Sequence, residues 1–380
     1  MSLPMNLPPA PQGAEGEMSY PFHRLMRRSA NYRWWRPLAF SGVGIGFYLA
    51  ALLIAMLAMF AALLMNPMTW AADNPEEAPD QFLMDPMLNM ASATDFSMTM
   101  ASLIIMIPAV FFAYLLIGPK PVGQLISVTG KLRWRWFGLA LAASAVLFAL
   151  YFGVNFGLGA VGIGASEPVP ASSLPTDPLF YALLVILLTP FQCAAEELVF
   201  RGAFMQVIGS WLKHPLFAIL LPVPLFTIGH LYDIWGLLDV AAFAIAAGYL
   251  TWRTGGLEAA MAMHIINNTF LFLLGAVGLV DLNATESNPV SLVFSVCFMA
   301  LLTFMLVKLA DRQGIARTAG PIPVADRRPL LQPWQMNQPP LRPNQPYWAP
   351  PAYQPEQQPH AGNPPVDSPP APRAPDPSDR

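Results

Sequence analysis

The sequence is poor in charged residues. Only 11% of its 380 residues are Asp, Glu, Lys or Arg, whereas 55% are hydrophobic. An average soluble domain has about 25% charged residues, so this chain lacks the polar surface that a soluble fold of its size needs. The deficit excludes an ordinary soluble globular enzyme and indicates that much of the protein surface faces lipid.

Cysteine is also scarce, with only Cys193 and Cys297, both inside apolar stretches. Two such residues provide neither a disulfide framework nor a Cys-rich metal site, and we expect both to be small apolar fillers. The HExxH motif of conventional zinc proteases is absent from the sequence. The chain ends in DPSDR, which is not a CAAX box, so prenylation of the protein itself is not expected.

The sequence is rich in long apolar runs. A helix crosses a bilayer in roughly 20 residues, and the chain has candidate spans at about 37–65, 97–118, 137–160, 179–200, 216–232, 234–252, 256–280 and 289–308. We therefore predict an all-α fold, a polytopic membrane helix bundle of about eight transmembrane helices. The first run is too long for the apolar part of a cleaved signal peptide, so we expect it to be retained.

Basic residues are missing from alternate connections between these runs. Residues 66–96, 161–178 and 281–288 contain no Lys or Arg, whereas Lys or Arg precede the first run and follow the second, fourth, sixth and eighth. Positively charged loops stay in the cytoplasm. The pattern predicts a multi-pass protein of the cell membrane with both termini cytoplasmic; the lipid bilayer is an expected partner, and nucleic acid is not.

Composition divides the chain into three regions. We predict a cytoplasmic N-terminal segment at 1–36, a transmembrane bundle at 37–313 and a cytoplasmic tail at 314–380. The tail is rich in Pro, Gln and Asn and lacks the apolar content for a core, which predicts disorder. Its Pro-Pro-Ala-Tyr stretch at 350–353 matches a short proline-motif ligand, so a tail-binding partner is a candidate.

The connection between the second and third runs has an amphipathic composition. Residues 119–136 combine several basic side chains with Trp134 and Trp136. Bases and tryptophans together are typical of segments that lie on anionic lipid headgroups. We predict that this elbow anchors the bundle at the membrane surface.

Three ionisable residues interrupt the fourth apolar run. Glu196, Glu197 and Arg201 lie within LLTPFQCAAEELVFRGAFMQ. An ionisable group in hydrocarbon costs on the order of 2.5–3.5 kcal/mol on insertion scales, so it normally pairs or faces a wet cavity. Glu197 and Arg201 are four residues apart and share a helix face, which favours an ion pair. Glu196 points about 100° away from Glu197 and needs a different partner.

Two histidines are candidate partners for Glu196. His230 and His264 lie in or at the edge of apolar runs, and Asn268 is one turn beyond His264 on the same face. Glu196 lies 17 residues before Lys213 (213 − 196) and His230 lies 17 after it (230 − 213). Two antiparallel helical arms would put them at similar depth. We predict that these residues converge on one cavity approached from the cytoplasm.

Such a set of side chains can activate water. A carboxylate can take the proton from water as it attacks a carbonyl, while imidazoles orient the water and stabilise the oxyanion. Alternatively, Glu196, His230 and His264 could hold a divalent ion such as Zn²⁺ with a bound water. Either route hydrolyses an amide without a Ser or Cys nucleophile. The structural alternative is that these groups only hydrogen-bond between helices.

Three short segments resemble the motifs of a known family. EELVFR, FTIGH and HIINN look like the EExxxR, FxxxH and HxxxN motifs of the CPBP family, also called the Abi family. That family groups CAAX prenyl endopeptidases with bacteriocin-processing and bacteriocin-immunity proteins. All three motifs occur in family order on separate apolar runs, and the resemblance covers about residues 120–280.

The resemblance implies an intramembrane endopeptidase and a role for each motif residue. Glu196 would be the base that activates water, with His230 and His264 holding that water or a metal ion. Asn268 would help to form the oxyanion site, and the neighbouring ion pair would support the geometry. The implied substrate is a peptide or protein at the membrane, such as a prenylated CAAX tail or a secreted peptide.

Two other classes of function stay open on the sequence. A bacteriocin-immunity or scaffold protein would hold a peptide or a toxin-related complex in the polar cluster without cutting it. A transporter would also place ionisable groups in the middle of the membrane. The Glu–His–His–Asn set favours hydrolysis because binding alone needs no base, and no inverted repeat supports a transporter.

Overall fold

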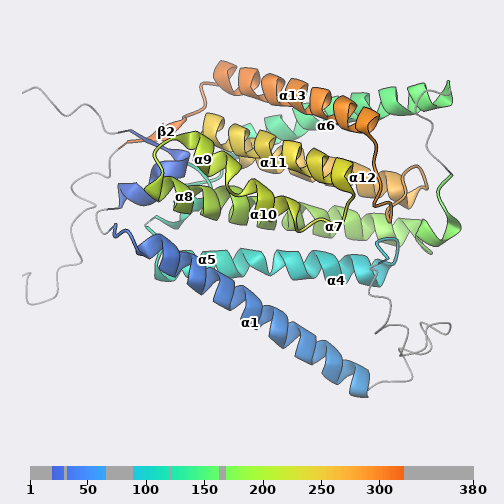
Figure 1. The fold of residues 1–380 in the computed structure, drawn as a ribbon, viewed down its shortest axis with the longest axis horizontal. Coiled ribbons are helices and arrows are strands. Elements are labelled where there is room, and N and C mark those ends of the chain that lie inside the picture. Colours follow the sequence, from blue (N-terminus) through green and yellow to red (C-terminus); the bar gives the residue numbers. More distant parts are fainter. Residues whose placement is uncertain (1–18, 30–31, 66–88, 120, 162–167, 321–380) are drawn as a thin grey trace, which may run out of the picture. The chain divides into compact units, whose positions relative to one another are not determined.

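The structure is a computed structural model, and it describes residues 19–29, 32–65, 89–119, 121–161 and 168–320 (Figure 1). The chain divides into two units, Met1–Arg327 and Arg328–Arg380. Every described residue belongs to the first unit. Residues 314–320 of the predicted disordered tail are described and contain a short paired strand, which corrects the prediction there; the remainder of the tail, with its Pro-Pro-Ala-Tyr motif, lies outside the described residues.

The described chain is almost entirely helical. Its longer helices are α1 (Arg36–Met65), α4 (Ala93–Ile104), α5 (Met106–Leu116), α6 (Trp134–Ala160), α7 (Pro178–Glu197), α11 (Ile234–Thr254), α12 (Glu258–Ala276) and α13 (Pro289–Arg312). Shorter ones are η1 (Phe22–Arg28), η2 (Val122–Leu125), η3 (Ala171–Ser173), η4 (Leu198–Phe204), α8 (Met205–Trp211), α9 (Pro215–Leu220) and α10 (Val223–Thr227). Strands β1 (Tyr20–Pro21) and β2 (Thr318–Ala319) pair antiparallel. The predicted all-α class is confirmed.

Within the described residues, seven helices are long and apolar enough to cross a membrane. They are α1, α4 with α5, α6, α7 with η4 and α8, α11, α12 and α13. The remaining predicted span, 216–232, consists of α9 and α10, which form a shorter apolar segment broken at Pro222. Proline removes a backbone donor and clashes with the preceding turn. The bundle of about eight helices is therefore present, with a short and broken fifth member.

Local sequence sets the ends of the helices that carry the polar residues. Asp177 caps α7 by accepting hydrogen bonds from two backbone N–H groups of the first turn, and Pro178 occupies a position where no N–H is needed. Asp233 caps α11 in the same way. α11 ends at Gly255, whose φ of 68° is left-handed and natural for glycine. A tight turn therefore leads directly into α12.

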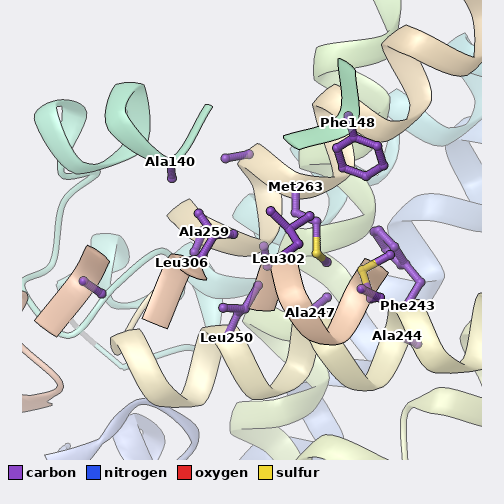
Figure 2. Close-up of a cluster of buried hydrophobic side chains, with 14 of the residues drawn as sticks. Ala140, Phe148, Phe243, Ala244, Ala247, Leu250, Ala259, Met263, Leu302 and Leu306 are labelled. Atoms are coloured by element: carbon purple, nitrogen blue, oxygen red, sulfur yellow. The ribbon is translucent and has the colours of Figure 1, made fainter. Parts of the chain in front are cut away.

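Helix α12 lies at the centre of the helix contacts. It packs against α6, α7 and α11, while α11 also packs against α13. Ala259, Ala260 and Ala262 of α12 are fully buried, and such small side chains allow helix backbones to approach closely. Figure 2 shows Met263 of α12 and Leu302 of α13 among side chains from α6 and α11. The packed cluster holds α12 in place.

Helix α1 is the least buried of the described candidate membrane spans. Only 6% of its candidate spanning window is buried, the smallest share among the seven. It contacts α5 and, to a smaller extent, α8. Phe40 is buried against Tyr114 of α5, with ring centroids 5.8 Å apart. The remaining apolar surface of α1 is typical of a helix that faces lipid.

The elbow between α5 and α6 packs against the rest of the bundle. Ser127 is fully buried, and the backbone N–H of Val128 donates to the Gly255 carbonyl at 2.9 Å. Trp134 is 71% exposed, as a headgroup anchor would be, but Trp136 is only 3% exposed. The backbone of the elbow is thus bonded to the α11–α12 turn, and its position at the membrane surface stays a prediction.

The N-terminal segment is also tied to the bundle. Element η1 packs on α8; Arg24 Nη1 donates to the Gly209 carbonyl at 2.9 Å, and Arg27 Nε donates to the Ser210 carbonyl at 2.5 Å. These carbonyls belong to the last turn of α8, where intrahelical donors run out. Strand β1 joins the same segment to residues 318–319, which the composition had placed in the tail.

Candidate active site

The charged residues of the fourth apolar run lie where helix α7 changes type. Glu196 and Glu197 end α7, and Arg201 lies in η4, a π-helical stretch that continues into α8. π-Helical turns are rare and frequently occur at functional sites. The two carboxylates and the guanidinium therefore occupy an irregular point within an otherwise continuous membrane helix.

Arg201 and Glu197 form a buried ion pair. Arg201 Nη1 lies 3.0 Å from Glu197 Oε1, the i,i+4 contact that the spacing predicts. Arg201 Nη2 donates to the Ala244 carbonyl of α11 at 3.3 Å. The guanidinium also lies over the Phe226 ring, 4.3 Å from its centroid, a favourable cation–π geometry. Arg201 thereby holds Glu197 against both α10 and α11.

His264 of α12 lies between the two carboxylates. Its Nδ1 is 2.8 Å from Glu197 Oε1, and its Nε2 is 3.5 Å from Glu196 Oε2. The sequence argument gave a histidine partner to Glu196 and treated the Glu197 pair as self-sufficient. The structure corrects that point, because Glu197 Oε1 is shared between Arg201 and His264.

The two glutamates differ in access to solvent. The Glu197 side chain is fully buried, whereas the Glu196 side chain is 10% exposed. Glu197 Oε2 is buried without a hydrogen-bond partner among the described residues. Glu196 is therefore the less buried of the two carboxylates.

His230 reaches the cluster from the loop after α10. Its Nδ1 donates to the carbonyl of Phe226 at 3.0 Å, and the two rings are 5.1 Å apart. The FxxxH spacing thus anchors the imidazole and leaves Nε2 for other partners. His230 interacts electrostatically with both Glu196 and His264. The broken fifth run still delivers this histidine to the cluster.

Asn268 lies one turn beyond His264 on α12. Its Nδ2 donates to Gln192 Oε1 of α7 at 3.4 Å, and its Oδ1 accepts from Asn267 Nδ2 at 3.0 Å. The structure therefore brings all six sequence-predicted residues to the region where α7, η4, α10, α11 and α12 meet. Their chemical roles remain predictions.

Two residues of this region were not singled out from the sequence. Gln192 had a signal, because it is a polar residue in an apolar run and lies four residues before Glu196 on the same helix face. Phe243 of α11 had none; its ring lies 4.9 Å from the His264 ring and 6.0 Å from the Arg201 guanidinium carbon. An aromatic residue in an apolar helix looks like any other core residue.

The candidate zinc ligands Glu196, His230 and His264 lie in this region. His264 Nδ1 faces Glu197 Oε1, and its Nε2 lies 3.5 Å from Glu196 Oε2. Across the described ranges, no group of three or more His, Cys, Asp or Glu side chains is placed to hold a metal ion. A divalent ion held by these three residues stays a prediction.

Part of the chain matches a known protein family. Residues 175–270 match the family model described as type II CAAX prenyl endopeptidase Rce1-like. The chain is also similar to a Bacillus subtilis (strain 168) protein described as uncharacterized protein YyaK, with 25% identity over 245 residues, which are 62% of this chain and 76% of that relative. No solved structure matches the chain significantly.

The matched range contains the charged residues of α7 and η4, the histidine after α10 and the polar residues of α12. The three motifs recognised in the sequence thus fall inside it. The match and the long apolar helices together indicate a multi-pass membrane protein. The match of residues 175–270 to the Rce1-like type II CAAX prenyl endopeptidase model is consistent with a CPBP-family intramembrane protease.

Proposed function

We propose that this protein is an intramembrane endopeptidase that hydrolyses a peptide bond with water activated by Glu196. The observation that carries the proposal is the position of His264 between a fully buried carboxylate, Glu197, and a less buried one, Glu196. A purely structural ion pair needs neither a second carboxylate nor an imidazole. General-base hydrolysis needs a carboxylate or imidazole that can take a proton from water.

The reaction needs one proton carrier and one oxyanion site. Glu196 takes a proton from water as the water oxygen attacks the substrate carbonyl carbon, and the carbonyl electron pair moves to its oxygen. The Asn268 amide N–H stabilises the resulting oxyanion, and the Nε2 atoms of the two imidazoles hold the attacking water. The carboxylic acid of Glu196 then passes its proton to the leaving nitrogen as the C–N bond breaks. The products are a carboxylic acid and an amine, which exchange a proton to become a carboxylate and an ammonium.

The buried ion pair orients the imidazole in this scheme. Glu197 accepts from His264 Nδ1 at 2.8 Å, which directs Nε2 toward Glu196. A carboxylate that holds an imidazole in one tautomer serves the same purpose in other hydrolases.

We also propose that the protein lies in the cell membrane with both termini in the cytoplasm. The support is the absence of Lys and Arg from residues 66–96, 161–178 and 281–288. The substrate is then a peptide or protein segment at the membrane. Labelling of single cysteines placed at position 24 and position 286 tests this topology, because only the second should react with an impermeant reagent added outside the cell.

Purified protein in lipid tests the proposed activity directly. The substrates are a prenylated CAAX peptide and a set of membrane-anchored peptides, and the variants are Glu196→Ala and His230→Ala. Asp311→Asn is the matched control, because Asp311 is a partly exposed carboxylate that contacts Arg253 instead of the cluster. We expect cleavage by wild type and Asp311→Asn and none by the two site variants, with all four folded.

Two other outcomes would redirect the proposal. A peptide that binds wild type and Glu196→Ala equally, with no cleavage by either, would establish the immunity or scaffold reading. Treatment with a chelator addresses the zinc route: full activity after chelation supports the metal-free step, whereas a loss restored by Zn²⁺ would replace it with a metal-dependent one.

A further inference from the structure

Gln192 is a buried amide at an unusual place in the membrane helix. It is 4% exposed and lies one turn before Glu196 on α7. A buried polar group is costly unless it is hydrogen-bonded. The Gln192 Oε1 atom accepts from Asn268 Nδ2 at 3.4 Å and from Cys193 Sγ at 3.3 Å. The amide of one helix therefore meets the amide of another beside the site.

The contacts of Asn268 define which end of its amide faces which neighbour. The oxygen and nitrogen ends of an Asn side chain have nearly the same shape, so sterics alone do not fix its orientation. Here Nδ2 faces an acceptor on α7, Gln192 Oε1, while Oδ1 faces a donor on α12, Asn267 Nδ2. A turn of the amide by 180° would oppose oxygen to oxygen and N–H to N–H. The two neighbours together lock one orientation.

We propose that Gln192 is a positioning residue that fixes the Asn268 amide so that an N–H group points to the reacting carbonyl oxygen. The inference rests on the proposed function. One Nδ2 hydrogen is used by Gln192; the amide also hydrogen-bonds the Cys193 thiol, and the oxyanion would take over that second hydrogen when substrate is bound. In the reversed orientation an oxygen would face the oxyanion and repel it. Gln192 itself does not contact the reacting atoms.

Loss of the Asn268 contact to the oxyanion should affect kcat and KM differently. An oxyanion contact is made only in the transition state, so its loss lowers kcat with little change in KM. Misplacement of a catalytic group costs on the order of 10²-fold. We expect Gln192→Leu to lower kcat by about 10- to 100-fold with KM changed less than about twofold.

The matched control is Gln206→Leu. Gln206 is also a fully buried amide on the same continuous helix, and its Nε2 donates to the Gln124 carbonyl at 2.7 Å. It lies outside the cluster of carboxylates and histidines. The loss of its hydrogen bond should lower the unfolding temperature and leave kcat near the wild-type value.

The decisive measurement places both Leu variants in an Asn268→Ala background. If Gln192 acts through Asn268, Gln192→Leu has little further effect on kcat once Asn268 is gone. Gln206→Leu should behave the same in both backgrounds. An equal loss of kcat from Gln192→Leu with and without Asn268, or a loss no larger than that of Gln206→Leu, overturns the inference.

Thermal unfolding of wild type, Gln192→Leu, Asn268→Ala and the double variant tests the contact without any measurement of activity. Shifts of Gln192→Leu and Asn268→Ala that do not add support the amide contact, and additive shifts overturn it. A wild-type protein that cuts no substrate would defeat the proposed function, and the unfolding cycle would still decide on Gln192. The two failures are therefore distinguishable.

Discussion

Two buried arginine–glutamate pairs in this protein are built in different ways. In the first, Arg133 Nε and Nη2 bind the two oxygens of Glu258 at 2.8 and 2.6 Å. Arg133 Nη1 donates to the carbonyls of Thr254 and Ala316, and the Arg133 backbone N–H donates to Glu258 as well. Both glutamate oxygens and all three guanidinium nitrogens have partners, so this pair is saturated.

The second pair is incompletely satisfied. Arg201 contacts one oxygen of Glu197, and the other oxygen is buried without a hydrogen-bond partner among the described residues. A second carboxylate and an imidazole lie beside it. A saturated pair can only hold parts of the chain together, here the elbow, the α11–α12 turn and the chain after α13. Spare hydrogen-bonding capacity next to titratable groups is what a reaction needs.

The largest expected effect is on catalysis, from a substitution of Glu196 beside the Arg201–Glu197 pair. Glu196→Gln keeps the shape of the side chain and removes the base, so we expect kcat to fall by about 10²- to 10⁴-fold. The unfolding temperature should change little, because Glu196 is partly exposed and its contact with His264 is long. Peptide cleavage and thermal unfolding are measured on the same preparation. Cleavage retained in Glu196→Gln would contradict the proposal that the Arg201–Glu197 pair belongs to a catalytic site.

Substitutions in the saturated Arg133–Glu258 pair should instead lower the free energy of unfolding. Arg133→Met leaves Glu258 buried and unpaired, which typically costs about 3–5 kcal/mol. The double variant Arg133→Met with Glu258→Met removes both charges and should regain much of that loss. Denaturant unfolding in detergent gives the free energies. A double variant as unstable as the single one would show that the backbone contacts of Arg133, rather than the ion pair, stabilise this region.

A smaller loss is expected where η1 meets α8. A Cβ at Gly209 would overlap the His23 carbonyl oxygen, so Gly209→Ala must displace η1. Overpacking of this kind costs about 1–3 kcal/mol. Gly138→Ala is the control, because a Cβ at Gly138 in α6 meets nothing within 4 Å. Faster protease cleavage near the N-terminus in Gly209→Ala, but not in Gly138→Ala, would locate the change; equal behaviour would contradict the close packing.

The smallest effect should come from pH. Burial lowers the pKa of His23 from its ordinary value of 6.5, against the hydrogen bond to the Lys213 carbonyl, with Arg24 and His214 lowering it further. The neutral ring is therefore favoured in the folded state. Its stabilising contribution is fully present above pH 6.5 and is lost as the pH falls toward the lowered pKa, by at most about 1.4 kcal/mol per pH unit.

Hydrogen exchange of η1 between pH 7.5 and pH 5 measures this loss. His23→Gln is the comparison, since it carries no titrating proton. We expect protection of η1 to decrease on acidification in wild type and to stay constant in His23→Gln. The same decrease in both proteins would assign the pH dependence to another group.

Some of the molecule was predictable from local pattern. Runs of about 20 apolar residues identify membrane helices because the bilayer core requires that length, and the run at 216–232 fell short of one helix because its prolines interrupt it. The i,i+4 spacing of Glu197 and Arg201 predicted their contact, because neighbours at that spacing share a helix face. Composition did not separate Trp134, which is exposed, from Trp136, which is buried against the bundle.

By itself the sequence determined the helical class, the faces of each helix and the set of chemical groups on them, because helical period and hydrophobic length are local properties. Only the tertiary structure decided that His264 serves both glutamates, that Gln192 meets Asn268 and that Arg133 meets Glu258. These contacts join residues between 67 and 125 positions apart. Which faces meet depends on the packing of α12 among its neighbours, and no local pattern encodes that choice.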